Sequence, residues 1–198
     1  MAKIKKNFFL FGSGGHAKAC IDVIETSGVY KIAAVIYKKK KPTDLFFSKY
    51  KLINENKLVS NYKNFNAIIG VGQIKSNLHR KNILKLIKKK RFKVASIYSK
   101  KAYISKTSKI NKGTIIMHNS FIGPNSLIGE NCIINTGAII EHDVKIGDHC
   151  HISTGCKING NVNVSNDCFI GSGTIIKEGV KIKPGRIIPM GSVIKKDV

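Results

Sequence analysis

The sequence is poor in acidic residues and has no long hydrophobic run. Only 11 of its 198 residues are Asp or Glu, against 35 Lys or Arg, which gives a net charge of +24. Its longest apolar runs, such as residues 7–12 and 67–72, are far shorter than the roughly 20 residues that a membrane-spanning helix needs. We therefore expect no transmembrane helix. The start of the chain also lacks the apolar stretch and cleavage site of a secretory signal, which predicts a cytoplasmic protein.

The positive charge is concentrated in the first half of the chain. Residues 1–100 contain 23 Lys or Arg and 4 Asp or Glu, whereas residues 101–198 contain 12 and 7. Such a charge would attract phosphorylated ligands, nucleic acid or anionic membrane surfaces. A general bias towards lysine explains it more simply. The four lysines at 38–41 have no aromatic residues between them, so we predict no nucleic-acid partner.

A six-residue repeat runs through the second half. From Ile104 to Ile194 every sixth residue is Ile or Val, sixteen positions in a row without an insertion. The fifth position of each block is small in all complete blocks but one, the exception being Arg186. One bulky and one small inward residue per block predict short strands joined by tight corners. Three blocks then form a triangular coil, so residues 18 apart lie one strand spacing, about 4.8 Å, from each other.

This pattern resembles the hexapeptide-repeat acyltransferases, and the resemblance covers residues 103–196. It implies a left-handed parallel β-helix, a homotrimer, and coenzyme A bound along the solenoid between neighbouring subunits.

The first hundred residues predict a small parallel α/β domain. A buried strand over residues 5–11 leads into a glycine turn and an apolar helical pattern, an arrangement that binds phosphate through the helix N-terminus. Alternating strands and helices are typical of such a domain. Further strands are expected at 31–37, 67–72 and 92–98, with a basic helix at 76–90. We therefore predict a Rossmann-like domain at 1–100 and a β-helix domain at 101–198.

The turn itself, Gly12-Ser13-Gly14-Gly15-His16-Ala17, fits the dinucleotide fingerprint in its G-x-G-x-x-A form. NAD is nevertheless disfavoured. An NAD site needs an acidic residue at the end of the second strand, where this chain has Tyr37 and Lys38.

Together, the turn, the α/β domain and the solenoid resemble the NeuD/PglD-like sugar acetyltransferases, which modify UDP-4-amino sugars or sialic acids. The resemblance spans nearly the whole chain. It implies that a nucleotide-linked sugar binds at the turn, with the substrate-binding residues Gly12, Ser13, Gly14, Gly15 and His16.

The same resemblance is sharpest in the run NTGAIIEHD, residues 135–143. It implies that His142 is the general base, Asp143 its acidic partner and Asn135 part of the acceptor pocket. It also implies that acetyl-CoA lies near His151 and the backbone N–H of Gly160.

The implied chemistry is sound on independent grounds. An amine or hydroxyl that attacks a thioester must lose a proton, and imidazole accepts one near neutral pH. Backbone N–H groups can stabilise the charge that develops on the carbonyl oxygen. Ser172 and Gly191, further along the solenoid, are weaker candidates for contacting the pantetheine arm.

Two other readings of the second half remain open. His118 and His142, with His149 or His151, could bind zinc between subunits, as in β-helix carbonic anhydrases. We expect no metal, because the acetyltransferase-like run is the better match, and we assign His149 to a solvated hydrogen-bonding ladder. A non-catalytic scaffold or nucleotide-sugar-binding protein would also explain the turn and the solenoid.

Cysteine chemistry is not expected. Four of the five cysteines occupy the inward fifth position of their blocks, and no Cys-x-x-Cys pair exists for a zinc knuckle or a redox centre. The sequence thus predicts an acetyl-CoA-dependent sugar acetyltransferase, but neither the sugar nor whether nitrogen or oxygen is acetylated.

Overall fold

The computed structural model describes residues 6–58 and 65–198, which form two compact units. Within those residues, the first unit takes in everything up to Gly72 together with residues 78–97. The second unit comprises residues 73–77 and 98–198. The five residues 73–77 therefore group with the second unit, although they lie inside the first hundred residues.

The first unit contains a parallel sheet of five strands in the order β3-β2-β1-β4-β5. The strands are β1 (Lys6–Phe11), β2 (Tyr30–Tyr37), β3 (Leu52–Asn54), β4 (Asn66–Ile69) and β5 (Lys93–Val94). The helices are α1 (Gly15–Ser27) and α2 (Leu78–Lys89), with short 3-10 turns η1 (Leu45–Phe47) and η2 (Glu55–Lys57).

The apolar run at 8–11 explains why β1 is the central strand. All four of its side chains are at most 2% exposed, as expected for a parallel sheet that is covered on both faces. Arg80 of α2 is also buried, and its guanidinium donates hydrogen bonds to the carbonyls of Ile69 (2.9 Å) and Val71 (2.6 Å). This contact ties α2 to the chain that follows β4.

The predicted elements of this unit are found with shifted ends. The strand expected at 92–98 is wrong as a single element, because it forms two strands of two residues that belong to different sheets, β5 and β6 (Ile97–Tyr98). The helix expected at 76–90 begins only at Leu78, and β3 was not predicted. Lys5, the first residue of the expected strand 5–11, lies outside the described residues.

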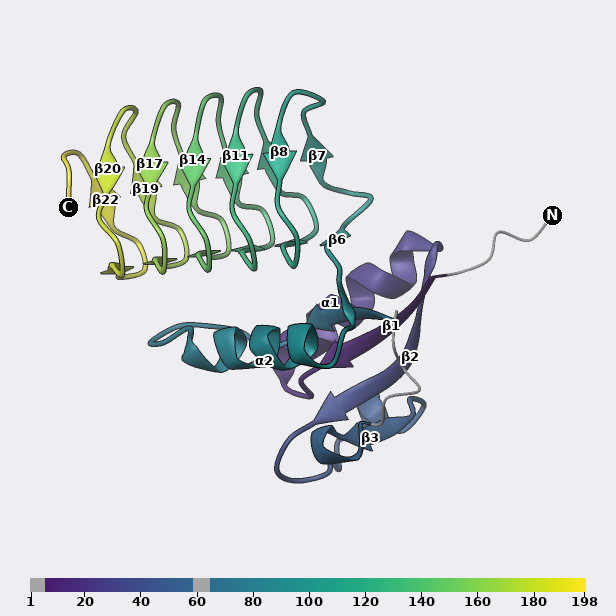
Figure 1. Ribbon diagram of the computed structural model, residues 1–198. Helices are drawn as coiled ribbons and strands as arrows, with labels where there is room; N and C mark the ends of the chain where they lie inside the picture. The colour runs from purple at the N-terminus through teal and green to yellow at the C-terminus, as the bar shows by residue number, and fades with distance from the viewer. Residues whose placement is uncertain (1–5, 59–64) are drawn as a thin grey trace. The chain divides into compact units, whose positions relative to one another are not determined.

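The second unit is a solenoid of two-residue strands that form three parallel sheets (Figure 1). We call these sheets the first, second and third faces. The first face consists of β6, β9 (Ile115–Ile116), β12 (Ile133–Ile134), β15 (His151–Ile152), β18 (Phe169–Ile170) and β21 (Ile187–Ile188).

The second face consists of β7 (Tyr103–Ile104), β10 (Phe121–Ile122), β13 (Ile139–Ile140), β16 (Lys157–Ile158), β19 (Ile175–Ile176) and β22 (Val193–Ile194). The third face consists of β8 (Lys109–Ile110), β11 (Leu127–Ile128), β14 (Lys145–Ile146), β17 (Asn163–Val164) and β20 (Lys181–Ile182). Figure 1 shows the strands of this face side by side along the solenoid.

The predicted register is confirmed: Phe121 pairs with Ile139, and the other strand pairs from β7 to β22 are likewise offset by 18 residues. The Ile and Val residues that begin the blocks form the core with the small residues of the fifth positions. The predicted fold, an α/β domain followed by a left-handed parallel β-helix, is therefore confirmed. Among the described residues, no helix is both long and apolar enough to cross a membrane.

Candidate active site

His142 and Asp143 lie on the corner that joins the second face to the third. The corner turns because Asp143 adopts a left-handed backbone conformation, with φ of 60°. The fourth position of almost every block does the same, and it is occupied by Gly, Asn, Asp or His, the residues that tolerate this conformation best. The side chains of His142 and Asp143 are 63% and 51% exposed, so both are open to a ligand.

The two side chains form a hydrogen-bonded pair. Nδ1 of His142 lies 2.8 Å from Oδ2 of Asp143, and this hydrogen bond holds the pKa of the Asp143 carboxyl below its usual value. The ionised carboxylate can only accept a hydrogen bond, so Nδ1 carries the proton. In the neutral ring Nε2 is then the basic nitrogen, and it points away from the carboxylate.

The imidazole of His142 rests on Gly160, one coil further on. A Cβ atom at Gly160 would lie 2.6 Å from both Cε1 and Nε2 of the ring, so only glycine leaves room for it. In the described part of the chain, the N–H of Gly160 donates to no backbone or side-chain acceptor. A basic nitrogen and an unused N–H donor therefore lie next to each other on one corner.

His151 and Asn135 form a second cluster, centred on the first face. His151 is buried, 6% exposed, and packs edge-on against Phe169. Nδ1 of His151 donates to the carbonyl of Gln73 (2.6 Å), and the side-chain amide of Asn135 lies 3.2 Å from Nε2. Because a carbonyl only accepts, the ring is the Nδ1–H tautomer and Nε2 accepts from Asn135. No motif or periodicity pointed to Gln73, which accepts from this ring although it lies 78 positions away in the chain.

The remaining candidates of the solenoid lie on the corner between the first and second faces. Oγ of Ser172 is 2.8 Å from Oγ of Ser153, and the N–H of Gly191 donates to the carbonyl of Ser172 (2.8 Å). Asn135 begins the same corner two coils earlier. In a single chain, one edge of the second face therefore carries His142, Asp143 and Gly160. The opposite edge of the same face carries Asn135, Ser172 and Gly191.

The three corner histidines lie on three different corners. His118 is on the corner between the first and second faces, His142 on the next, and His149 on the third. Across residues 6–58 and 65–198, no group of three or more His, Cys, Asp or Glu side chains is arranged to bind a metal ion. His149 pairs with Asn131 (3.1 Å), as expected, but Asn131 is fully buried, so this ladder is less solvated than predicted.

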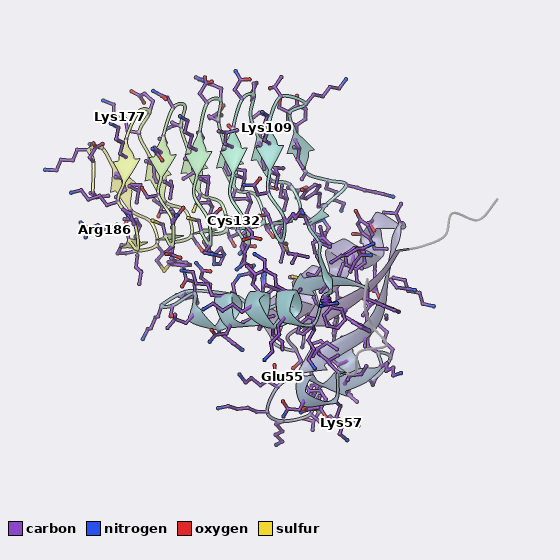
Figure 2. The ribbon with its side chains drawn as sticks, in the orientation of Figure 1. Glu55, Lys57, Lys109, Cys132, Lys177 and Arg186 are labelled. Atoms are coloured by element: carbon purple, nitrogen blue, oxygen red, sulfur yellow. The ribbon has the colours of Figure 1, made fainter. Side chains whose placement is uncertain are left out.

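All five cysteines are buried, as the repeat predicts for four of them. Cys132, whose position is labelled in Figure 2, is 0% exposed, and burial raises the pKa of the Cys20 thiol to about 12. A buried thiol with a raised pKa stays protonated and is a poor nucleophile.

The glycine turn opens onto a pocket within the first unit. The pocket has a volume of about 260 Å³, and Gly12, Ser13 and Gly14 form one wall. Gly12 has φ of 122°, and a Cβ there would lie 2.7 Å from Cγ2 of Val71, so the turn requires glycine. Gly14 precedes α1, Gly15 is its first residue, and a Cβ at either would meet only open space. His16 lies against Gly72 and does not line the pocket.

Comparison with known families identifies both units. Residues 98–198 match the family model described as GMPPB C-terminal domain, and residues 7–87 match the PglD N-terminal domain. The expected resemblance to PglD-like proteins is thereby confirmed. Compared by sequence with curated proteins, the chain matches none.

Solved structures share the fold over almost the entire chain. The acetyltransferase domain of PglB from Neisseria gonorrhoeae, also solved with acetyl coenzyme A, is 22% identical with a TM-score of 0.86, covering 98% of this chain and 93% of its own. PerB from Caulobacter crescentus, solved with CoA and GDP-perosamine, is 24% identical with a TM-score of 0.85, covering 97% and 90%. WeeI from Acinetobacter baumannii is 20% identical with a TM-score of 0.79, covering 98% and 93%. At such identities the likeness establishes the fold.

Proposed function

Because the chain belongs to the GMPPB C-terminal domain family over residues 98–198 and carries a PglD-type N-terminal domain, we propose that it is an acetyl-CoA-dependent sugar acetyltransferase. Its acceptor is a nucleotide-linked amino sugar or a sialic-acid-like sugar of surface glycan biosynthesis. The observation that carries the proposal is the His142–Asp143 pair resting on Gly160. The dependence on acetyl-CoA, a cytoplasmic metabolite, supports the expected cytoplasmic location.

His142 acts as the general base. Its Nε2 takes the proton from the attacking amine or hydroxyl, and the Asp143 carboxylate, 2.8 Å from Nδ1, stabilises the imidazolium that forms. Asp143 also selects the tautomer that leaves Nε2 basic. The transfer is direct, and the buried cysteines take no part in it.

Gly160 supplies the group that stabilises developing negative charge. Acetyl-CoA would contribute a thioester, whose carbonyl oxygen gains charge as the acceptor attacks. An unused backbone N–H next to Nε2 of His142 is a donor suited to that oxygen. Such donors each contribute roughly 3 kcal/mol in enzymes where they have been removed.

The glycine turn binds the nucleotide part of the acceptor. The pocket of about 260 Å³ beside Gly12, Ser13 and Gly14 has room for part of a nucleotide, and the start of α1 favours a phosphate. PerB, which has the same fold, was solved with GDP-perosamine and CoA, which supports a nucleotide-linked sugar and a coenzyme A thioester as substrates here.

The enzyme works as a homotrimer. The outer side of the second face is apolar for most of its length, with the exposed residues Tyr103, Ile175 and Val193, and Phe121 stacks on Tyr103 at 5.1 Å. If three copies turn this face towards a threefold axis, the His142 edge of one meets the Asn135 edge of the next. Acetyl-CoA would then bind where the two edges meet, near Ser172, Gly191 and His151.

Thiol release from acetyl-CoA, measured with a panel of UDP- and GDP-linked amino sugars and sialic acids, tests the activity. We expect release with at least one acceptor, and we expect His142→Asn to lower kcat by about 10²- to 10⁴-fold because the base is lost. The matched control is His149→Asn, which changes a corner histidine that we assign no role and introduces a residue common at that position.

Unchanged turnover in His142→Asn would refute the mechanism. Binding of nucleotide-linked sugars without thiol release from any acceptor would instead favour the non-catalytic alternative, a scaffold or nucleotide-sugar-binding protein.

A further inference from the structure

The pocket at the glycine turn contains a carboxylate that the sequence did not lead us to expect. The first hundred residues hold only four acidic residues, Asp22, Glu25, Asp44 and Glu55. Asp44 pairs with Lys18, and Glu25 pairs with Lys49 and Tyr50. Glu55, labelled in Figure 2, is the one that lines the pocket.

Glu55 is held differently from its acidic neighbours. Its side chain is 16% exposed, against 47% for both Asp44 and Glu25. Within residues 6–58 and 65–198, its one side-chain partner is Nζ of Lys38, at 3.6 Å, and Lys38 is itself 56% exposed. A largely buried carboxylate with a single loose partner has acceptor capacity left for a ligand.

Glu55 occupies a position similar to that of the ribose-binding acid of dinucleotide-binding folds, but it follows β3 and not the second strand of the chain, β2. Dinucleotide-binding folds use an acidic residue at the end of the second strand, and this chain has Tyr37 and Lys38 there. β3 lies next to β2, with Asn54 paired to Tyr37, and Glu55 follows Asn54 directly. Its carboxylate therefore lies at the carboxyl edge of the parallel sheet, where such folds bind their ligands.

We propose that Glu55 accepts hydrogen bonds from the 2′- and 3′-hydroxyl groups of the ribose of the acceptor's nucleoside diphosphate. The inference rests on the proposed function, since it assumes a nucleotide-linked sugar in this pocket. The diphosphate lies at Gly12, Ser13 and Gly14, and Lys38 is the ion-pair partner of the carboxylate in the free protein. The absence of an acid at the end of β2 thus does not exclude a ribonucleotide.

Calorimetric titration of the full chain with UDP and GDP, their 2′,3′-dideoxy forms and inorganic pyrophosphate tests this role. We expect the wild-type protein to bind at least one ribonucleotide about 10- to 100-fold more tightly than its dideoxy form, or more tightly still, since losing even one hydrogen bond to a charged group has an effect of this size. Glu55→Gln should lose that preference, whereas Glu25→Gln, which removes a paired acid outside the pocket, should keep it.

The change in pyrophosphate affinity caused by Glu55→Gln distinguishes recognition of the ribose from a general electrostatic effect of the carboxylate. Removing a negative charge near a diphosphate strengthens anion binding, so Glu55→Gln should bind pyrophosphate at least as tightly as the wild type. That binding also shows that the variant is folded.

Equal binding of ribo and dideoxy forms by the wild-type protein would overturn the inference and leave acetyl transfer untouched. A ribose preference that depends on Glu55, with no thiol release from any acceptor, would uphold the inference and refute the proposed activity. Acetyl transfer with no binding of either nucleoside diphosphate would overturn the inference.

Discussion

At the scale of single residues, the geometry of the proposed site depends on the missing side chain of Gly160. The ring of His142 occupies the space that a Cβ would fill, at 2.6 Å from Cε1 and Nε2. His142 is largely exposed, so its ring can swing away if that space is taken. A side chain at position 160 should therefore displace the His142 ring without a comparable loss in the free energy of unfolding.

We predict that Gly160→Ala lowers kcat about 10- to 100-fold while the free energy of unfolding changes by less than about 1 kcal/mol. Gly171→Ala is the matched comparison. Its Cβ would lie 2.4 Å from the backbone nitrogen of Met190, which cannot move aside, so this variant should lose about 1–3 kcal/mol. Urea denaturation and thiol-release assays on both variants measure the two effects. A full loss of stability in Gly160→Ala would contradict the prediction.

The fifth position of the repeat carries a second residue-scale regularity. Eight of its hydroxyl and thiol groups donate to a backbone carbonyl 15 residues on, at the same corner of the next coil, with donor–acceptor distances of 2.7–3.2 Å. The eight donors are Ser108, Thr114, Ser126, Cys132, Cys150, Cys156, Cys168 and Thr174. Ser120 and Ser192 donate instead to the carbonyl three residues before them. Small size and a hydrogen to donate explain why Ser, Thr and Cys are frequent there. Arg186, the exception, is exposed and labelled in Figure 2.

At the scale of elements, almost every corner of the solenoid depends on one left-handed residue. Asn119 has φ of 57°, and the equivalent residue of seven other corners is glycine. A β-branched side chain in this conformation clashes with the backbone, at a cost of about 1–2 kcal/mol.

We therefore predict that Asn119→Val destabilises the solenoid by about 1–2 kcal/mol, whereas Asn119→Gly stays within about 0.5 kcal/mol of the wild type. Chemical denaturation followed by circular dichroism provides the measurement. Equal stability of the two variants would mean that the left-handed backbone conformation does not determine which residues are tolerated at position 119.

The elements also show what the sequence could predict. The solenoid register was predictable because an unbroken period of six fixes which side of the chain is buried, and all strand offsets of 18 residues follow from it. β3 was missed because its three residues, Leu52–Asn54, are all half-buried and carry too short a pattern. Glu55 was missed with it, since its relevance depends on the pairing of β3 with β2.

The contacts of Gln73 could not be predicted either, for a different reason. Residues 73–77 have no periodicity, yet Gln73 donates to the carbonyl of His149 (2.7 Å) and accepts from His151, while Asn77 donates to Asp167 (2.5 Å). Only the fold brings residues more than 70 positions apart into contact. His142 and Asp143, by contrast, are neighbours in sequence, so their pairing could be anticipated from the chain alone.

At the scale of the whole molecule, the candidate residues are divided between two edges of the second face. One edge carries His142, Asp143 and Gly160, and the other carries Asn135, Ser172 and Gly191. If the edges of different copies form each site, activity requires assembly. We predict a particle of about 65 kDa, three times the 21.8 kDa of one chain, by light scattering.

Mixing two inactive variants tests this arrangement directly. His142→Asn and Asn135→Ala each damage one edge, so each homotrimer should have strongly reduced activity. After the two are unfolded and refolded together in equal amounts, about one quarter of the interfaces should combine an intact His142 edge with an intact Asn135 edge. Turnover should therefore recover to about one quarter of the wild-type value. If the mixture is no more active than the variants refolded separately, the two edges do not form a site between copies of the chain.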